Sequence, residues 1–198
     1  MIDRKLQKAG IKRIAGVDEA GRGACAGPLV VAAVILEDLD HSSTLGIRDS
    51  KELSLDEREE LFPKILENTI AFSIIEISPF EIDQKGLHKC NIEGMRRAVT
   101  SLTVRPDYVL TDGYEIPGLD VSNLAVWKGD QVALSISAAS IIAKVHRDRL
   151  MVKLDREYSG YRLSEHKGYA TAAHEEAIKK LGVSSIHRKS YSNVAKYL

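Results

Sequence analysis

This 198-residue sequence has no long hydrophobic run, few cysteines and no excess of either charge. Its longest apolar stretch, Ala24–Leu36, spans 13 residues, whereas a membrane-spanning helix needs about 20. No basic start followed by an apolar core opens the chain, so we expect no secretory signal. Two cysteines, Cys25 and Cys90, are too few for a disulfide scaffold and favour free thiols in a reducing cytoplasm.

Charge is balanced, with 28 basic and 28 acidic side chains. A basic excess is the usual signature of nucleic-acid-binding proteins, so the balance counts against that class at first sight. Net charge does not describe where the charges lie, however. From Lys128 to the end the chain carries 13 basic and 7 acidic residues, and Ala177–Leu198 carries five basic and no acidic ones. The balance therefore conceals a basic C-terminal third.

Length and composition predict a single folded domain. A chain of this length fits one domain and buries roughly 70% of its unfolded surface. Its 44% hydrophobic and 28% charged residues exclude disordered and fibrous classes. We expect one monomeric domain over residues 1–198, with residues from about 159 to 198 as a helical C-terminal extension.

Strand and helix signals predict a mixed α/β order. Short runs rich in Val and Ile indicate strands, and the Ser-x-x-Glu boxes at Ser54 and Ser78 indicate helix starts. The first two strands flank Gly21-Arg22-Gly23 as a hairpin, so we expect an α/β layer fold with a partly antiparallel sheet. We expect strands at Ile14–Val17, Leu29–Leu36, Thr69–Ile77, Asp107–Leu110 and Leu124–Trp127, and helices at 54–68, from 78, through 95–102, from 131 to about 158 and at 171–181.

Four carboxylates come at or just after the ends of predicted strands. Asp18 and Glu19 follow Ile-Ala-Gly-Val, Asp112 follows Tyr-Val-Leu-Thr, and Asp130 follows Ala-Val-Trp-Lys-Gly. The carboxyl ends of strands are where α/β sheets place ligands. Several buried carboxylates together are costly unless cations neutralise them, and Mg²⁺ and Mn²⁺ prefer such oxygen ligands. Two of these ions about 3.5–4 Å apart can clamp the attacking and leaving oxygens of a phosphodiester.

Each of these acids also has a structural interpretation. Asp130 stands where a helix N-cap belongs, and Asp112 precedes a glycine as in many turns. Adjacent strand residues point to opposite faces, so Asp18 and Glu19 share a site only if the strand ends or bulges there. No dinucleotide-binding glycine motif, P-loop or zinc-ligand spacing competes with the metal hypothesis.

Sequence blocks along almost the whole chain match one family in order. They are Gly16-Val17-Asp18-Glu19-Ala20-Gly21-Arg22-Gly23, Ala26-Gly27-Pro28, Asp49-Ser50-Lys51 with Leu53, Asp112-Gly113, Lys128-Gly129-Asp130, the segment Ser137–Asp148, His166-Lys167-Gly168-Tyr169 with Thr171 and His174, and Ile186-His187-Arg188. Together these blocks resemble the type 2 ribonuclease H family, specifically ribonuclease HII.

The resemblance implies a fold, an activity and a mechanism. The fold is ribonuclease H-like, with a mixed, roughly five-stranded sheet flanked by helices and a helical C-terminal part. The activity is metal-dependent hydrolysis of the RNA strand of RNA–DNA hybrids and cleavage 5′ to single ribonucleotides embedded in duplex DNA, leaving 3′-hydroxyl and 5′-phosphate ends. Asp18, Glu19, Asp112 and Asp130 match the catalytic and metal-binding acids, which implies two-metal-ion hydrolysis with Mg²⁺ or Mn²⁺.

The resemblance also implies substrate-binding residues. Only the 2′-hydroxyl distinguishes a ribonucleotide within a duplex, and the small glycines of Gly21-Arg22-Gly23 let the backbone approach the sugar. Tyr169 matches the tyrosine that stacks on the sugar next to the scissile site; its alternative is an interior tyrosine before a helix. Lys51, Lys144 and Arg147 are expected to contact phosphates, their alternative being solvated surface charges. We read His88, His146 and His174 as surface or hydrogen-bonding residues.

A few positions depart from the family pattern. Ala24-Cys25 replaces a Pro-Leu-type pair, Gly86-Leu87 replaces a common Asn-Ile, and Tyr191 stands for a common Phe.

The expected partner is a hybrid or ribonucleotide-containing duplex, with no membrane. The segment Tyr191–Leu198 matches a clamp-binding peptide poorly, so a sliding-clamp partner is unsupported. Two rival functions are a non-catalytic nucleic-acid binder of the same fold, which the four acids argue against, and a hydrolase of small phosphate esters.

Overall fold

The computed structural model describes residues 1–47 and 50–198; Asp49 of the Asp-Ser-Lys block lies outside the described residues. Its centre is a five-stranded sheet in the order β3-β2-β1-β4-β5, which confirms the predicted mixed sheet. β1 (Ile14–Ala20) pairs antiparallel with β2 (Leu29–Leu36) and parallel with β4 (Tyr108–Asp112). β3 (Thr69–Ile77) is antiparallel to β2, and β5 (Asn123–Val126) is parallel to β4.

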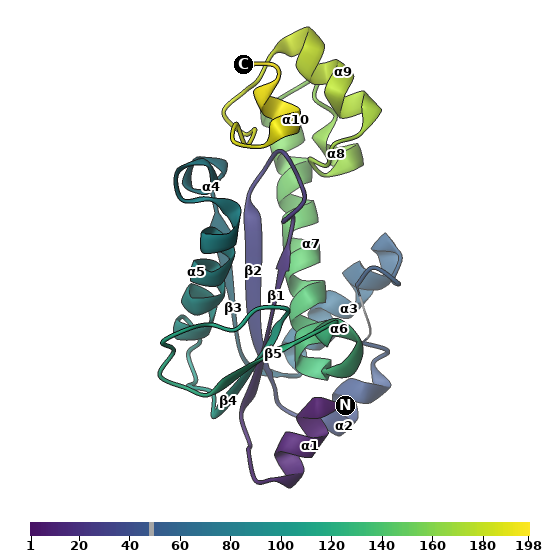
Figure 1. The fold of residues 1–198 in the computed structure, drawn as a ribbon. Helices are drawn as coiled ribbons and strands as arrows, with labels where there is room; N and C mark the ends of the chain where they lie inside the picture. Colours follow the sequence, from purple (N-terminus) through teal and green to yellow (C-terminus); the bar gives the residue numbers. More distant parts are fainter. Residues whose placement is uncertain (48–49) are drawn as a thin grey trace.

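Helices cover both faces of this sheet (Figure 1). α7 (Leu134–Glu157) and α3 (Leu55–Glu67) share a hydrophobic core with one face, and α5 (Leu87–Thr100) shares a second core with the other. The other helices are α1 (Ile2–Lys8), α2 (Leu39–Thr44), α4 (Pro79–Lys85), α6 (Gly129–Val132), α8 (Leu163–His166), α9 (Ala172–Leu181) and α10 (Ser192–Ala195).

The continuous hydrophobic run of β2 follows from its position inside this sandwich. All its residues are buried, and alternate side chains enter the two cores, with Val30 on the α7 face and Val31 on the α5 face. On the neighbouring strand, Gly16 lets α7 pack directly on β1, because a Cβ at this position would lie 2.0 Å from the carbonyl carbon of Ser135. This close approach holds the α7 N-terminus next to the N-terminal half of β1.

Two predicted helices are divided in the structure. Ala133 is extended and separates α6 from α7, so Asp130 lies inside a short helix and the predicted long helix starts three residues late. Gly86, with φ of 83°, separates α4 from α5. The first strand continues to Ala20 instead of ending at Val17.

The C-terminal helices α8, α9 and α10 lie at the opposite end of the molecule from the N-terminus (Figure 1). α8 and α9 share a small core with α7 and the loop after β1, built on Met151, Tyr161 and Ile178. Both cysteines, Cys25 and Cys90, are buried and free, as predicted. Across the described ranges, no helix combines the length and the hydropathy that a membrane crossing requires.

Candidate active site

Three of the four predicted acids meet where β1 and β4 separate. The ladder between these strands ends at the pair Val17–Thr111, so Asp18 and Asp112 are the next residues on the two diverging strands. The register of β1 with β2 runs without a shift through Asp18 and Glu19. The prediction that the strand ends or bulges here, so that these two side chains share a site, is therefore wrong.

Asp18 and Glu19 instead approach the site from the two faces of the sheet. Ser140 of α7 hydrogen-bonds to Asp18, whereas Glu19 is turned toward Asn91 of α5. The negative charge of Asp112 raises the pKa of both carboxylates. Asp112 lies near them because the pairing of β1 with β4 ends at Val17 and Thr111, directly before Asp18 and Asp112. An open strand edge thus replaces a bulge as the feature that gathers the acids.

These two carboxylates are electrostatically unfavourable in the charged state. Burial raises the pKa of Asp18 well above its usual range, and the charges of Glu19 and Asp112 add to this effect. Burial also raises the pKa of Glu19, opposed by the Arg22 guanidinium. The Oε2 atom of Glu19 is buried without a hydrogen-bond partner among the described residues, which is costly unless a cation or a solvent molecule meets it.

Asp112 connects this strand pair to the fourth acid. Its Oδ1 accepts a hydrogen bond of 2.7 Å from the Gly129 amide, and this bond fixes the start of α6. Asp130, the next residue, is almost completely buried, and its Oδ2 lies 3.4 Å from Lys51 Nζ. Glu19, Asp112 and Asp130 line one pocket of about 450 Å³, with Asp18 buried behind them.

The donor chemistry of this pocket fits a hard divalent cation. Four carboxylates supply only oxygen ligands, the set that Mg²⁺ and Mn²⁺ prefer. A cation bound here would meet the unpartnered oxygen of Glu19 and offset the burial and repulsion that raise the pKa of Asp18. In residues 1–47 and 50–198, however, no three histidine, cysteine or carboxylate side chains are arranged so that they could hold an ion.

The Gly21-Arg22-Gly23 loop and Tyr169 lie together beside this pocket. Gly21 has φ of 86°, and a Cβ there would lie 1.8 Å from Arg147 Nε, so only glycine fits. A Cβ on Gly23 would lie 3.8 Å from the Tyr169 ring, which is 39% exposed. Gly23, which is exposed, and the Tyr169 ring therefore lie side by side at the surface, and the interior position considered for Tyr169 is wrong.

The C-terminal part holds the Arg22 carbonyl in place. Arg188 Nη1 donates to this oxygen at 3.0 Å, and the Tyr191 hydroxyl donates to it at 2.8 Å. The phenylalanine that is common at position 191 has no hydroxyl, so the departure of this chain from the family pattern adds a hydrogen bond to the glycine loop. Gly86, another of the departures, lies at the junction of α4 and α5, away from these contacts.

The three cations expected to contact phosphates differ in accessibility. Lys51 lines the acidic pocket and is 79% exposed. Lys144 is half-buried and donates to Asp148 at 2.7 Å. Arg147 is completely buried, and its N–H groups donate to the carbonyl oxygens of Pro28, Lys167 and Ala26. A phosphate contact by Arg147 is therefore wrong for this structure, because the guanidinium instead joins the loop after β1 to the Tyr169 loop.

Trp127 and Asn91 are among the residues at the site that were missed from the sequence. Trp127, the single tryptophan, is 83% exposed and lines the pocket beside Lys128. Its position directly before Lys128-Gly129-Asp130 is a signal that could have identified it. Asn91 is fully buried, and neither atom of its amide has a hydrogen-bond partner within the described part of the chain. Nothing in the sequence indicates Asn91, because its approach to Glu19 depends on how α5 packs on β1.

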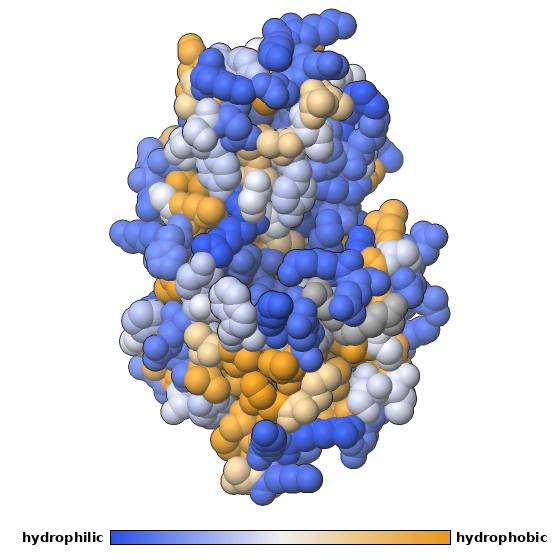
Figure 2. All heavy atoms as spheres, turned by 45° about the vertical axis from the view of Figure 1, so that its right-hand side comes forward, coloured by the Kyte–Doolittle hydropathy of each residue, from blue (hydrophilic) through white to orange (hydrophobic). Residues whose placement is uncertain are grey.

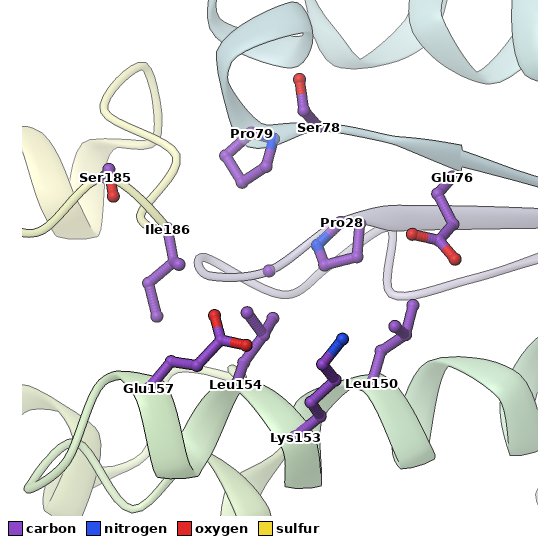
Figure 3. A pocket seen from close by; sticks show the side chains of 11 residues that line it. Pro28, Glu76, Ser78, Pro79, Leu150, Lys153, Leu154, Glu157, Ser185 and Ile186 are labelled. Atoms are coloured by element: carbon purple, nitrogen blue, oxygen red, sulfur yellow. The ribbon is translucent and has the colours of Figure 1, made fainter.

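A second pocket, of about 390 Å³, lies between α7 and the ends of β2 and β3 (Figure 3). Pro28, Pro79 and Leu154 give it apolar walls, and its charged residues are Glu76, Lys153 and Glu157. Two carboxylates beside one lysine do not favour a phosphate, and none of the predicted site residues lines this pocket. The acidic pocket is thus the better candidate for the chemistry.

Comparisons with known proteins point to the same group of enzymes. A family model described as ribonuclease HII matches residues 15–194. The chain is 50% identical over 194 residues to ribonuclease HII of Salinispora tropica, covering 98% of this chain and 72% of that protein. It is 50% identical over 192 residues to ribonuclease HII of Cutibacterium acnes, covering 97% and 94%.

Solved structures give the same result for the fold. Ribonuclease H2 of Pyrococcus horikoshii OT3 superposes with a TM-score of 0.81 at 30% identity, covering 93% of this chain and 96% of that one. Ribonuclease HII of Archaeoglobus fulgidus, in a complex with PCNA, has a TM-score of 0.76 at 28% identity, covering 91% and 95%. A Bst ribonuclease HIII in complex with Mn²⁺ shares the fold alone, with a TM-score of 0.72 at 21% identity, covering 93% and 68%.

Proposed function

We propose that Asp18, Glu19, Asp112 and Asp130 form the catalytic centre of this chain, which belongs to the ribonuclease HII family. The enzymes of this family are endoribonucleases that cleave RNA in RNA–DNA hybrids and at ribonucleotides embedded in DNA. The observation that carries this proposal is the buried carboxylate of Asp18 and the buried Oε2 of Glu19, beside Asp112 at an open strand edge. Such a costly arrangement is retained where a site needs its charge. The products carry 3′-hydroxyl and 5′-phosphate ends, with cleavage 5′ to a single ribonucleotide.

We propose that these four carboxylates hold two divalent cations, Mg²⁺ or Mn²⁺. Bound ions supply activation of the attacking water and stabilisation of the leaving 3′ oxygen. The Bst ribonuclease HIII with Mn²⁺ is a distant relative that binds such an ion. In this chain Glu19 offers an unpartnered oxygen, and the hydrogen bond from Gly129 to Asp112 Oδ1 orients that carboxylate toward the pocket.

The substrate residues that we propose form one surface around these acids. The Gly21-Arg22-Gly23 backbone and the Tyr169 ring read the ribose at the scissile position. Lys51 and, more weakly, Lys144 contact phosphates, since burial lowers the pKa of Lys144 and Asp148 already occupies its ammonium group. We propose that the protein acts on the duplex as a monomer. The free cysteines fit a reducing cytoplasm.

A sliding-clamp partner is not part of this proposal. The PCNA complex belongs to the Archaeoglobus fulgidus enzyme. In this chain the C-terminal residues are engaged in the fold: Val194 is buried, and the Tyr197 hydroxyl donates to Glu175 Oε1 at 2.5 Å. A peptide that must leave the surface to bind a clamp would lose these contacts.

Cleavage of a duplex with one ribonucleotide tests the catalytic assignment. We expect Asp112→Asn to lower the single-turnover rate at least about 100-fold and to change the affinity for uncleaved duplex less than about threefold. Asp120→Asn, in the same loop region but exposed, serves as the matched control and should cleave normally. Product-end mapping checks the position of the cut.

Three outcomes would contradict the proposal. An intact ribonucleotide strand with both Mg²⁺ and Mn²⁺ would exclude the activity. Equal losses of rate and binding in Asp112→Asn would assign Asp112 a structural role. Hydrolysis of a small phosphate ester that ignores added hybrid duplex would favour the rival small-molecule hydrolase.

A further inference from the structure

Three histidines to which the proposed function gives no role lie together beneath Tyr169. His174 and His187 are buried; of the two alternatives given for His174, surface or hydrogen-bonding, the second is confirmed. The His166 ring stacks on His174, with centroids 4.2 Å apart and an interplanar angle of 17°. The cluster joins three segments far apart in sequence, because Cys25 Sγ also lies 3.7 Å from His174 Nδ1.

The hydrogen-bond partners of this cluster fix the proton on each ring. The Ser184 amide can only donate, and it lies 3.1 Å from His187 Nδ1. That nitrogen is therefore the acceptor, and the proton of a neutral His187 is on Nε2. His187 Nε2 lies 3.2 Å from His174 Nε2, so His187 donates and His174 accepts.

The same reasoning carries the chain to Tyr169. With Nε2 as the acceptor, the proton of His174 is on Nδ1. This atom lies 3.0 Å from the Tyr169 carbonyl oxygen, which can only accept. A continuous chain of donors therefore runs from Ser184 through His187 and His174 to Tyr169, and each link permits one direction.

His166 fits this scheme independently. The Gly168 amide donates to His166 Nδ1 at 3.2 Å, which leaves Nε2–H to donate to the Tyr161 carbonyl at 2.9 Å. The Gly168 carbonyl in turn accepts from the Cys25 amide at 2.9 Å. The peptide groups on both sides of Gly168 are thus held, while the Tyr169 ring itself is partly exposed.

We propose that His174 and His187 are positioning residues, whose fixed tautomers anchor the Tyr169 backbone so that the ring stands against Gly23. The proposal rests on the role of Tyr169 in the proposed function. The Arg147 guanidinium lies over the partly exposed Tyr169 ring, 5.7 Å from its centroid, and the backbone beneath the ring sets the direction in which it projects. Loss of the Nδ1–H donor leaves the Tyr169 carbonyl with the Thr171 amide, 3.0 Å away, as its remaining donor among the described residues, and so lets the ring move relative to the sugar.

Ring nitrogen NMR tests the chain directly. Long-range ¹H–¹⁵N spectra at pH 7 should show neutral rings, with the proton of His174 on Nδ1 and those of His166 and His187 on Nε2. A His174 ring that carries its proton on Nε2, or a cationic His174 or His187 at this pH, would overturn the proposal.

Two substitutions of one residue test the consequence for catalysis. An asparagine amide can reach the place of Nδ1, whereas a glutamine amide reaches the place of Nε2. We expect His174→Asn to keep kcat on a single-ribonucleotide duplex within about threefold and His174→Gln to lose about tenfold, the value of one buried hydrogen bond. Similar melting temperatures for the two variants would separate this effect from stability.

A double-mutant cycle with Tyr169→Ala completes the test. If His174 acts through Tyr169, His174→Gln should cost nothing further in the Tyr169→Ala background. Equal losses in the two His174 variants, or additive losses in the cycle, would overturn the positioning role. Unchanged cleavage by Tyr169→Ala alone would overturn the role of Tyr169 in the proposed function, and wrong tautomers would overturn only the histidine chain.

Discussion

At the scale of single residues, the Asp18 carboxylate serves catalysis at a cost to the stability of the fold. Its charge is buried beside two other carboxylates, so replacement by the isosteric amide should relieve repulsion while removing a catalytic oxygen. We predict that Asp18→Asn lowers the cleavage rate about 10²–10³-fold and raises the free energy of unfolding by about 1 kcal/mol or more at pH 7. Single-turnover cleavage and urea denaturation measure the two effects.

The metal hypothesis makes a further demand on the same variant. Mg²⁺ should raise the melting temperature of the wild-type protein, because a ligand that binds only the folded state stabilises it. The rise in melting temperature should be smaller in Asp18→Asn, whereas Asp120→Asn should show the same rise as the wild-type protein. An Asp18→Asn protein that is less stable than wild type without metal would show that the carboxylate has a structural function.

Trp127 offers a direct report of substrate binding. It is the single tryptophan, is 83% exposed and lies at the rim of the acidic pocket, where a bound duplex would cover it. We predict that a ribonucleotide-containing duplex quenches or shifts Trp127 fluorescence and that Trp127→Ala weakens binding about tenfold, within the range for nucleotide stacking on an aromatic ring. Phe72→Ala, an exposed aromatic change on β3 at the opposite sheet edge, should bind normally. Tight binding without a fluorescence change would contradict this contact.

At the scale of elements, α7 is capped by a residue from the other end of the chain. Ala133 provides no side-chain cap; instead the buried Asp3 of α1 accepts from the amides of Leu134 and Ser135 at 2.7 and 3.1 Å. Its negative charge also suits the positive end of the helix. This contact ties α1 to the long helix that packs against β1 and Asp18.

We predict that Asp3→Ala lowers the free energy of unfolding by about 2 kcal/mol, since it removes the cap and leaves two buried amides unpartnered. Urea denaturation measures the loss. Asp40→Ala, which removes a largely exposed carboxylate paired with Arg4, should change stability by less than about 0.5 kcal/mol. Equal effects of the two substitutions would remove the capping argument.

The elements that local sequence determines were predicted well, and those that depend on distant contacts were not. β2 was predicted with its bounds because a central strand is hydrophobic on both faces. The break at Ala133 was missed because the cap that lets α7 start there comes from Asp3. Likewise the four acids could be named from motifs, but the arrangement of Asp18 and Glu19 on opposite faces depends on where the β1–β4 ladder ends.

At the scale of the whole molecule, the C-terminal part completes the site as well as extending the fold. Arg188 and Tyr191 hold the Arg22 carbonyl, and the histidine chain holds Tyr169. Hydrophilic side chains cover most of the upper part of the molecule in Figure 2, where these helices lie. We therefore propose that residues 159–198 belong to one domain with the sheet and present a polar, basic surface to the duplex.

Acid should loosen this C-terminal part before the sheet. Burial lowers the pKa of His187 to about 4, against about 6.5 in an unfolded chain. Below pH 6.5 the unfolded state binds a proton at His187 that the folded state does not bind until the pH approaches 4. The contribution of His187 to the free energy of unfolding is therefore complete above pH 6.5 and declines by about 3 kcal/mol as the pH falls toward 4. Asp18 and Glu19 act with the opposite sign, because protonation of carboxyls with a raised pKa relieves their repulsion in the folded state.

The two opposite effects can be separated because they lie in different parts of the molecule. We predict that hydrogen exchange, corrected for intrinsic rates, accelerates in residues 161–198 between pH 7 and 5 while β1 and β2 keep their protection. His187→Gln has no titrating ring at position 187, and its amide can still reach His174 Nε2, so the acceleration should shrink to the part that His174 contributes, because burial lowers the pKa of that ring too. Uniform loss of protection across the sheet, or an unchanged pH response in His187→Gln, would mean that other groups control the acid response and that the histidine chain does not connect the C-terminal part to the site.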